Sequence, residues 1–225
     1  MRALRGRAAA MVRFAYKHGE AVVIERDLVD GAPIRDEGRV SVVPIVPDHM
    51  SSLDTLGADG NAESARRRIR NYVELGYRGY LAMCDGTAIG YGWWVDASFP
   101  SERLHPAMQQ YRIVLQPGEL YAFEIFVAPQ FRGMGMATAF MQATLQGWLS
   151  DGYRRAIGFV DARNLAARTL YRMTGWTDTR RCVTHTLFKR LLVVDGQVFL
   201  RNRPSSRPHS FDYRLVYSRK PAATG

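Results

Sequence analysis

Two glycines and an arginine stand between a strongly apolar segment and a helical pattern. The apolar segment, LYAFEIFVA at 120–128, is followed by Gln130-Phe131-Arg132-Gly133-Met134-Gly135-Met136-Ala137. Glycines let the backbone bend so that successive N–H groups point into one concavity, and a helix start adds unpaired donors and the positive end of its dipole. Arg132 adds a cation. This glycine loop (residues 130–137) therefore predicts a cradle for a diphosphate, with a simple tight turn as the alternative interpretation.

Other phosphate loops and a serine nucleophile are excluded by the same kind of inspection. A P-loop requires Gly-Lys-Ser/Thr, which the chain lacks. A dinucleotide fingerprint requires a third glycine where Thr138 stands. The chain also lacks the Gly-x-Ser-x-Gly motif of an α/β-hydrolase.

A second motif follows the glycine loop and makes the pattern specific. It reads Asn164-x-x-Ala167-x-x-Leu170-Tyr171-x-x-x-Gly175-Trp176. Together with Val127-x-Pro129-x-x-Arg132-Gly133-x-Gly135-x-Ala137, it resembles the GNAT acyltransferase superfamily. The resemblance covers roughly residues 39–189. It implies a mixed α/β fold with a central, splayed β-sheet flanked by helices, and an N-acyltransferase that uses acyl-CoA.

The resemblance also implies a role for individual residues. Backbone groups near Phe126 and Val127 would bind the pantetheine arm, in the gap where this strand splays from the strand at 154–161. Asn164 would contact the cofactor, although it is also suited to cap a helix. Tyr171 stands where the family often places a general acid, and packing alone is the alternative. The backbone N–H groups expected to bind the diphosphate of coenzyme A are those of Arg132, Gly133, Met134, Gly135, Met136 and Ala137.

Attack of an amine on a thioester sets its own chemical requirements. The reaction needs a neutral amine, a positioned carbonyl, a donor for the developing oxyanion and a proton for the departing sulfur. A backbone N–H near Val127 can supply the oxyanion donor, and Tyr171 can supply the proton. Glu124 is the only carboxylate in the apolar segment, where an unused charge is costly, so it is the candidate base. The alternative is that Glu124 pairs with an arginine. His49, His105 and His185 receive no role.

The elements that would position these residues alternate along the chain. Strands are expected at 20–28, 39–46, 120–128, 154–161, 176–189, 191–200 and 211–218, with a hairpin at 80–97 around Asp85-Gly86. Helices are expected at 61–75, from the glycine loop to about Ser150, and at 166–173. The proline-containing stretch 99–117 reads as an irregular connection. The expected organisation is a flexible basic arm at 1–18 and one domain at 19–225, with a minimal core at 39–189 and a strand extension at 190–225.

Composition sets the broad class of the protein. The chain has 225 residues, 47% of them hydrophobic and 23% charged, which excludes disordered, collagen-like and coiled-coil proteins. No stretch approaches the ~20 apolar residues of a membrane span. Cys84 and Cys182 are far apart and lack nearby histidine clusters, so a zinc site and a disulfide framework are not expected. A reducing compartment and a cytoplasmic location fit this usage.

The net charge of +10 lies almost wholly in the second half of the chain. Residues 1–112 hold 15 basic and 14 acidic residues, whereas residues 113–225 hold 16 and 7. This asymmetry indicates a polyanionic partner, although 28 of the 31 basic residues are arginine and codon composition explains that bias equally well. A nucleic-acid-binding module is therefore an alternative function, but the chain lacks the aromatic-interleaved basic stripe of single-strand binders. The arginines that would form such a surface are Arg180, Arg181, Arg190, Arg201, Arg203 and Arg207.

The expected function is transfer of an acetyl group from acetyl-CoA to a primary amine, by direct attack in a ternary complex. A longer acyl donor is the alternative within the same fold, because acyl length depends on pocket depth. The acceptor remains open between a small amine, an amino sugar, an antibiotic and a protein. The insertion at 99–117, the strand before residue 30 and the C-terminal strands are expected to determine acceptor specificity or to form a homodimer interface.

Overall fold

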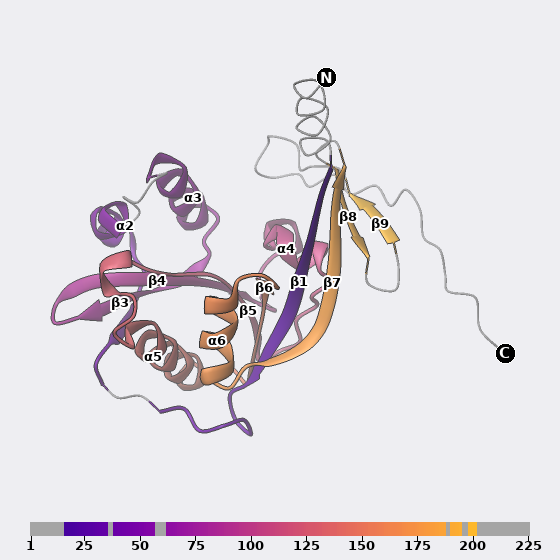
Figure 1. Ribbon diagram of the computed structural model, residues 1–225. Coiled ribbons are helices and arrows are strands. Elements are labelled where there is room, and N and C mark those ends of the chain that lie inside the picture. Colours follow the sequence, from indigo (N-terminus) through magenta and orange to yellow (C-terminus); the bar gives the residue numbers. More distant parts are fainter. Residues whose placement is uncertain (1–15, 36–37, 57–61, 188–189, 195–197, 202–225) are drawn as a thin grey trace, which may run out of the picture.

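The computed structural model describes residues 16–35, 38–56, 62–187, 190–194 and 198–201. Its strands and helices alternate along these residues (Figure 1). The strands are β1 (Tyr16–Asp27), β2 (Ser41–Pro44), β3 (Arg78–Cys84), β4 (Thr87–Asp96), β5 (Glu119–Val127), β6 (Arg155–Asp161), β7 (Thr177–Leu187), β8 (Arg190–Val194) and β9 (Val198–Arg201). The α-helices are α2 (Met50–Leu56), α3 (Ala62–Glu74), α4 (Pro106–Gln110), α5 (Met136–Ser150) and α6 (Leu165–Met173). Short 3₁₀ turns are η1 (Pro47–His49), η2 (Ser101–Arg103) and η3 (Pro129–Phe131).

The described strands form one sheet in the order β2-β3-β4-β5-β6-β1-β7-β8-β9. All neighbouring strands are antiparallel except β5 and β6, which are parallel. Their pairing covers only Glu119–Tyr121 against Arg155–Ile157. Beyond these residues the two strands diverge, and we call this unpaired region the splay. The predicted mixed α/β fold with a splayed sheet is confirmed.

Strand β1 lies in the middle of the sheet, although it comes first along the chain. It pairs with β6 on one edge, where Ala21 faces Asp161, and with β7 on the other, where Ala21 faces Cys182. In Figure 1 the indigo β1 and the orange β7 run side by side. The sequence predicts a strand before residue 30 but not this position. The strand also begins at Tyr16, so residues 16–18 of the predicted arm belong to it; residues 1–15 lie outside the described residues.

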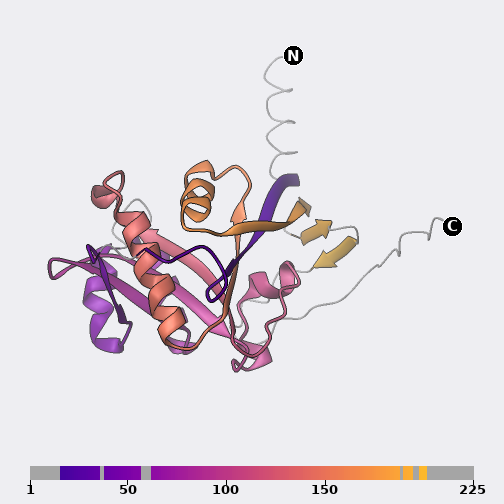
Figure 2. The same cartoon turned by 90° about the horizontal axis from the view of Figure 1, so that it is seen from below.

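Helices cover both faces of the sheet. Buried side chains of α2, α3 and α4 pack on one face against Trp93 and Tyr121. On the other face, Met141, Leu145 and Trp148 of α5 pack with α6 against the sheet. Figure 1 shows α2 and α3 above the strands and α5 and α6 beneath them, and Figure 2 shows α5 and α6 from below. The splay between β5 and β6 therefore has helices on both sides.

The expected helices and strands agree with the structure apart from three regions. Helix α2, preceded by the turn η1, lies in residues 47–56, where the expected elements include no helix. The stretch 99–117 contains η2 and α4, which the sequence analysis read as irregular. Pro106 occupies the first turn of α4 and the His105 side chain accepts a hydrogen bond from the Ala107 N–H, but five residues are too few to show a helical period. The expected strand 191–200 is the hairpin of β8 and β9. The expected strand 211–218 lies outside the described residues.

Candidate functional site

A β-bulge in β5 places Glu124 at the splay. Tyr91 of β4 pairs with Phe126 and Trp93 pairs with Phe123, so Gly92 alone faces both Glu124 and Ile125. Glu124 adopts φ 50°, a conformation that non-glycine residues rarely hold. A bulge bends the strand and redirects a side chain. Here it turns the Glu124 side chain toward α3.

Three side chains hold the Glu124 carboxylate. Arg68 of α3 donates from Nε to Oε2 at 2.7 Å and from Nη2 to Oε1 at 2.6 Å. The Tyr72 hydroxyl donates to Oε2 at 2.8 Å, and the Tyr91 hydroxyl donates to Oε1 at 3.3 Å. We call these four residues the Glu124 cluster. From the sequence alone, Glu124 is interpreted either as a base or as the partner of an arginine. The geometry favours the arginine partner, because both carboxylate oxygens already accept hydrogen bonds.

The same cluster changes the chemistry of its other members. Hydrogen bonding to Glu124 raises the pKa of Arg68, so the guanidinium stays charged. Burial, with the Glu124 charge as the next cause, raises the pKa of both Tyr72 and Tyr91, so both hydroxyls keep their protons. Sequence reasoning missed Arg68 and Tyr72, which lie more than fifty positions before Glu124. The one available signal was that they stand four residues apart on the predicted helix 61–75.

The glycine loop presents unoccupied backbone donors at the start of α5. Gly133 has φ 82° and Gly135, the N-cap of α5, has φ 77°, both accessible chiefly to glycine. No described residue accepts a hydrogen bond from the N–H groups of residues 133–138. A Cβ added at Gly133 would meet no atom within 4 Å, so the space above it is open. The Arg132 N–H differs, because it donates to the Pro129 carbonyl at 3.1 Å. The open donors thus begin at Gly133.

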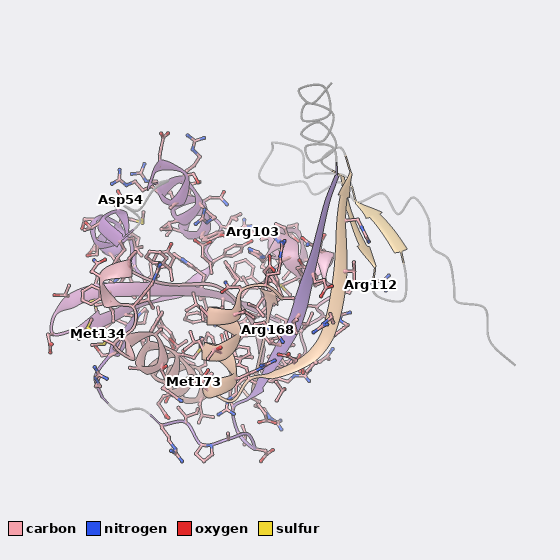
Figure 3. All side chains as sticks on the ribbon, in the orientation of Figure 1. Asp54, Arg103, Arg112, Met134, Arg168 and Met173 are labelled. Atoms are coloured by element: carbon pink, nitrogen blue, oxygen red, sulfur yellow. The ribbon has the colours of Figure 1, made fainter. Side chains whose placement is uncertain are left out.

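Two guanidinium groups lie beside the glycine loop. Arg132 folds back to β5, where its Nε donates to the Val127 carbonyl at 2.8 Å and its guanidinium carbon lies 5.5 Å from the centre of the Phe126 ring. Arg39 reaches the loop from the segment before β2, and its Nη2 donates to the Met134 carbonyl at 3.3 Å. Figure 3 labels Met134 near the start of α5. Nothing in the sequence pattern pointed to Arg39.

The backbone of β5 presents its groups unequally to the splay. The Phe126 carbonyl oxygen faces Gly90 of β4, where a Cβ added to the glycine would clash with it. The Ala128 N–H also faces β4 and donates to the Ile89 carbonyl at 2.9 Å. Because backbone groups alternate along a strand, Val127 faces away from β4, and its carbonyl accepts from Arg132. Of the two residues predicted to bind pantetheine, Val127 is therefore the one oriented toward the splay.

Helix α6 brings Asn164 and Tyr171 to the other side of the splay. Asn164 Oδ1 accepts from the Ala167 N–H at 3.1 Å, which confirms the predicted helix cap. Tyr171 packs in a cluster with Ala122 of β5 and Val160 of β6, and its ring meets Trp176 edge-on at 5.3 Å. Burial raises the pKa of Tyr171 to about 12. Its hydroxyl makes no hydrogen bond to any described residue, so the donor is available to a ligand.

An open surface depression of about 550 Å³ lies along α3 beside the Glu124 cluster. Its lining shares Arg68 with that cluster and includes Arg67, whose Nη2 lies 2.9 Å from Glu63 Oε1. The remaining lining side chains carry hydroxyl, amide or carboxylate groups. The residues that line it are Glu63, Ser64, Arg67, Arg68 and Asn71.

Metal-ligating clusters and the partners of the second-half arginines can be compared with the sequence interpretation in the described part of the chain. Within it, no group of three or more histidine, cysteine, aspartate or glutamate side chains could hold a metal ion. Several second-half arginines pair with carboxylates: Arg155 with Glu119 at 2.5 Å, Arg168 with Asp178 at 2.9 Å and Arg181 with Glu20 at 3.9 Å. Of the arginines proposed for nucleic-acid binding, Arg203 and Arg207 and the side chains of Arg190 and Arg201 lie outside what the structure describes. No described helix is both long and apolar enough to cross a bilayer.

Comparison with known proteins gives one family and several similar folds. A family model described as the acetyltransferase (GNAT) family matches residues 51–176, more than half of the chain. A GNAT-family acetyltransferase from Colwellia psychrerythraea is 13% identical with a TM-score of 0.53, over 77% of this chain and 57% of that one. A glucosamine N-acetyltransferase region in a fungal multi-domain GH3 β-N-acetylglucosaminidase is 14% identical with a TM-score of 0.58, over 79% of this chain and 22% of that one. A functionally unknown conserved protein from Staphylococcus epidermidis is 11% identical with a TM-score of 0.52, over 79% of this chain and 64% of that one.

These similarities define the fold and the matched region. At such identities, the likeness to solved structures concerns the fold alone. The chain also spans less than two thirds of the length of each of these three structures. The search of the curated proteins found no match.

Proposed function

The chain belongs to the GNAT acetyltransferase family, and from this premise we propose that it transfers an acetyl group from acetyl-CoA to a primary amine. The observation that carries the proposal is the glycine loop, whose open N–H groups lie between the end of β5 and the start of α5. The splay continues from this loop between β5 and β6. A diphosphate-bearing thioester fits this pair of features, because the loop would hold the diphosphate and the splay would hold the extended arm.

The residues present fit coenzyme A. Six consecutive N–H groups, from Gly133 to Thr138, have no acceptor among the described residues, and the positive end of α5 adds to their potential. The space that a Cβ at Gly133 would fill is empty. Coenzyme A would supply the activated thioester, while the Val127 carbonyl, whose second lone pair is left by the bond from Arg132, would accept from the extended pantetheine arm. The Asn164 amide stands at the start of α6, beside the divergent end of β6.

The side chains of this protein would then divide the work of direct amine attack in a ternary complex. The Val127 N–H would donate a hydrogen bond to the carbonyl oxygen as it gains negative charge. The Tyr171 hydroxyl would donate its proton to the departing sulfur. The hydroxyl is protonated at neutral pH, and burial, which raises its pKa to about 12, makes it a weaker acid than a solvent-exposed tyrosine. The same water-poor surroundings raise the pKa of the departing thiol, so the sulfur takes up the proton readily and the negative charge passes to the Tyr171 oxygen.

Glu124 has two proposed roles that lead to different behaviour. As a base, it would accept the proton of the incoming ammonium group, directly or through water. As an arginine partner, it would hold α3 against the bulge through Arg68. The residues that line the open depression beside the Glu124 cluster all carry polar side chains, so we propose that the amine acceptor enters from α3 and is itself hydrophilic.

A combined binding and turnover assay tests the proposed function. Coenzyme A and acetyl-CoA should raise the melting temperature of the protein, because they bind the folded state. Acetyl-CoA with pooled amines should release free thiol, and the same pools without protein should not. A shift and turnover obtained only with longer acyl-CoAs would favour the alternative donor. Absence of both a shift and turnover with every acyl-CoA would refute acyl transfer.

A further inference from the structure

Arg39 lies at the rim of the glycine loop, far from both sequence motifs. Its Nη2 donates to the Met134 carbonyl at 3.3 Å, and its Nη1 lies 3.4 Å from the position that a Cβ on Gly135 would take. Arg39 is exposed and forms no salt bridge to any described acidic residue. Among the described residues, therefore, no carboxylate pairs with this positive charge, which stands beside a run of open backbone donors.

The other arginine at the loop is already engaged. Arg132 has its Nε bonded to the Val127 carbonyl and its guanidinium lies over the Phe126 ring. These contacts direct it toward β5. Arg39 also uses one donor, but that donor anchors it to the glycine loop itself, at the Met134 carbonyl, so its remaining donors lie beside the open N–H groups. The geometry thus separates a cation held at the end of β5 from a cation held at the open donors of the glycine loop.

We infer that Arg39 binds the diphosphate of coenzyme A together with the N–H groups of the glycine loop. The inference rests on the proposed function and adds a binding residue from the segment that joins β1 to β2. A diphosphate seated above Gly133 and Gly135 lies within reach of a guanidinium already placed beside Gly135. A guanidinium matches phosphate oxygens in both charge and planar geometry.

Binding measurements on Arg39→Gln test the inference, with Arg35→Gln as the matched control. Arg35 is exposed in the same segment, and its loss removes the same charge. Titration calorimetry should show affinity for coenzyme A reduced roughly tenfold or more in Arg39→Gln, the loss expected for a hydrogen bond between charged groups. Arg35→Gln should stay within about twofold of the parent, and Arg39→Lys should lie between. Pantetheine, which lacks phosphate, should bind the parent and all variants equally.

Dephospho-coenzyme A, which keeps the diphosphate and lacks the 3′-phosphate, identifies the phosphate concerned. An equal loss for both ligands in Arg39→Gln supports the diphosphate contact, and a loss confined to coenzyme A overturns it. Unchanged affinity for coenzyme A in Arg39→Gln also overturns the inference. So does a loss in Arg35→Gln as large as that in Arg39→Gln, because a general effect of charge would then explain both. Melting temperatures of the unliganded variants check that each is folded. A parent that binds no coenzyme A refutes the proposed function itself, whereas a parent that binds it with Arg39→Gln unchanged refutes the role of Arg39 alone.

Discussion

Tyr171 packs in a cluster shared by β5, β6 and α6. Its buried hydroxyl neither donates a hydrogen bond to a described residue nor accepts one from it. Tyr171→Phe should retain the edge-on contact with Trp176 while removing the proton donor. We expect kcat to fall by about 10- to 100-fold, with little change in affinity for acetyl-CoA, because the hydroxyl acts only as sulfur departs. Steady-state kinetics and a coenzyme A titration measure the two effects. Parent-like turnover would assign the proton to another group or to water.

Glu124→Gln distinguishes the two roles of the carboxylate. If Glu124 supports Arg68, the variant leaves that guanidinium without its counter-charge, so the melting temperature should fall while the pH–rate profile keeps its shape. If Glu124 is the base, the acidic limb of kcat/KM should disappear or move toward the pKa of the amine. Both quantities are measured on the one variant.

Glu63→Gln provides the matched control for this comparison. It removes a carboxylate from an arginine pair on the same helix, with Arg67 at 2.9 Å, but both side chains are at least 80% exposed. Such exposed pairs contribute little to stability, so its melting temperature should stay close to that of the parent. A Glu124→Gln protein as stable and as active as the parent at every pH would exclude both roles.

At the residue scale, sequence reasoning identified groups but not their neighbours. Glu124 is conspicuous because it interrupts an apolar strand, and Asn164 because it precedes a helix. The hydrogen bonds from Arg68 and Tyr72 depend on how α3 crosses the sheet, which no local pattern encodes. The φ of 50° at Glu124 was likewise hidden, because a bulge is defined by the partner strand as much as by its own residues.

The glycine loop is the element most directly tied to the proposed function. Gly133→Val should abolish the thermal shift caused by coenzyme A, because its side chain enters the open space above the loop and its φ of 82° is unfavourable for a β-branched residue. Gly76→Val is the control: Gly76 has φ 76° and open surroundings but lies after α3, away from the loop. Gly76→Val should lose about as much stability as Gly133→Val, but coenzyme A should still raise its melting temperature. A shift retained in Gly133→Val would remove the loop from the binding site.

Elements with a clear period were predictable, and short or non-local ones were not. Helix α5 and the hairpin of β3 and β4 agree with the sequence prediction because many residues contribute to each pattern. Helix α4 is too short to show a period. The position of β1 depends on partners at the far end of the chain, and its apolar residues would suit any interior position in the sheet.

Across the whole molecule, one buried carboxylate links separate parts of the fold. Asp96 Oδ2, at the end of β4, lies 2.7 Å from Arg78 Nη1 and accepts from the Tyr153 hydroxyl at 2.7 Å. Burial acts to raise the pKa of Asp96, but hydrogen bonds from Ser98 and Tyr153 and the charge of Arg78 outweigh it and lower the pKa below the usual value. The folded state therefore favours the ionised carboxylate.

This preference predicts how stability responds to acid. A carboxylate whose pKa is lowered by folding contributes stability above its unfolded pKa of about 3.9, and that contribution is lost as the pH falls through the lower folded value. The free energy of unfolding of the parent, measured with denaturant, should thus decrease as the pH is lowered from about 5 to about 2. Asp96→Asn should be less stable at pH 7 and show a smaller loss over this range. An identical pH dependence in the two proteins would show that other carboxylates carry the effect.

The central position of β1 has a consequence for the order in which the protein can fold. During synthesis β1 leaves the ribosome before every other described strand, yet its partners β6 and β7 emerge near the end. Contacts between segments so distant in sequence close large loops and form slowly. A nascent chain that has reached Trp176 contains every residue of both motifs, but β1 then has a partner on one edge alone. The residues that define the family are therefore complete before the sheet that supports them can close.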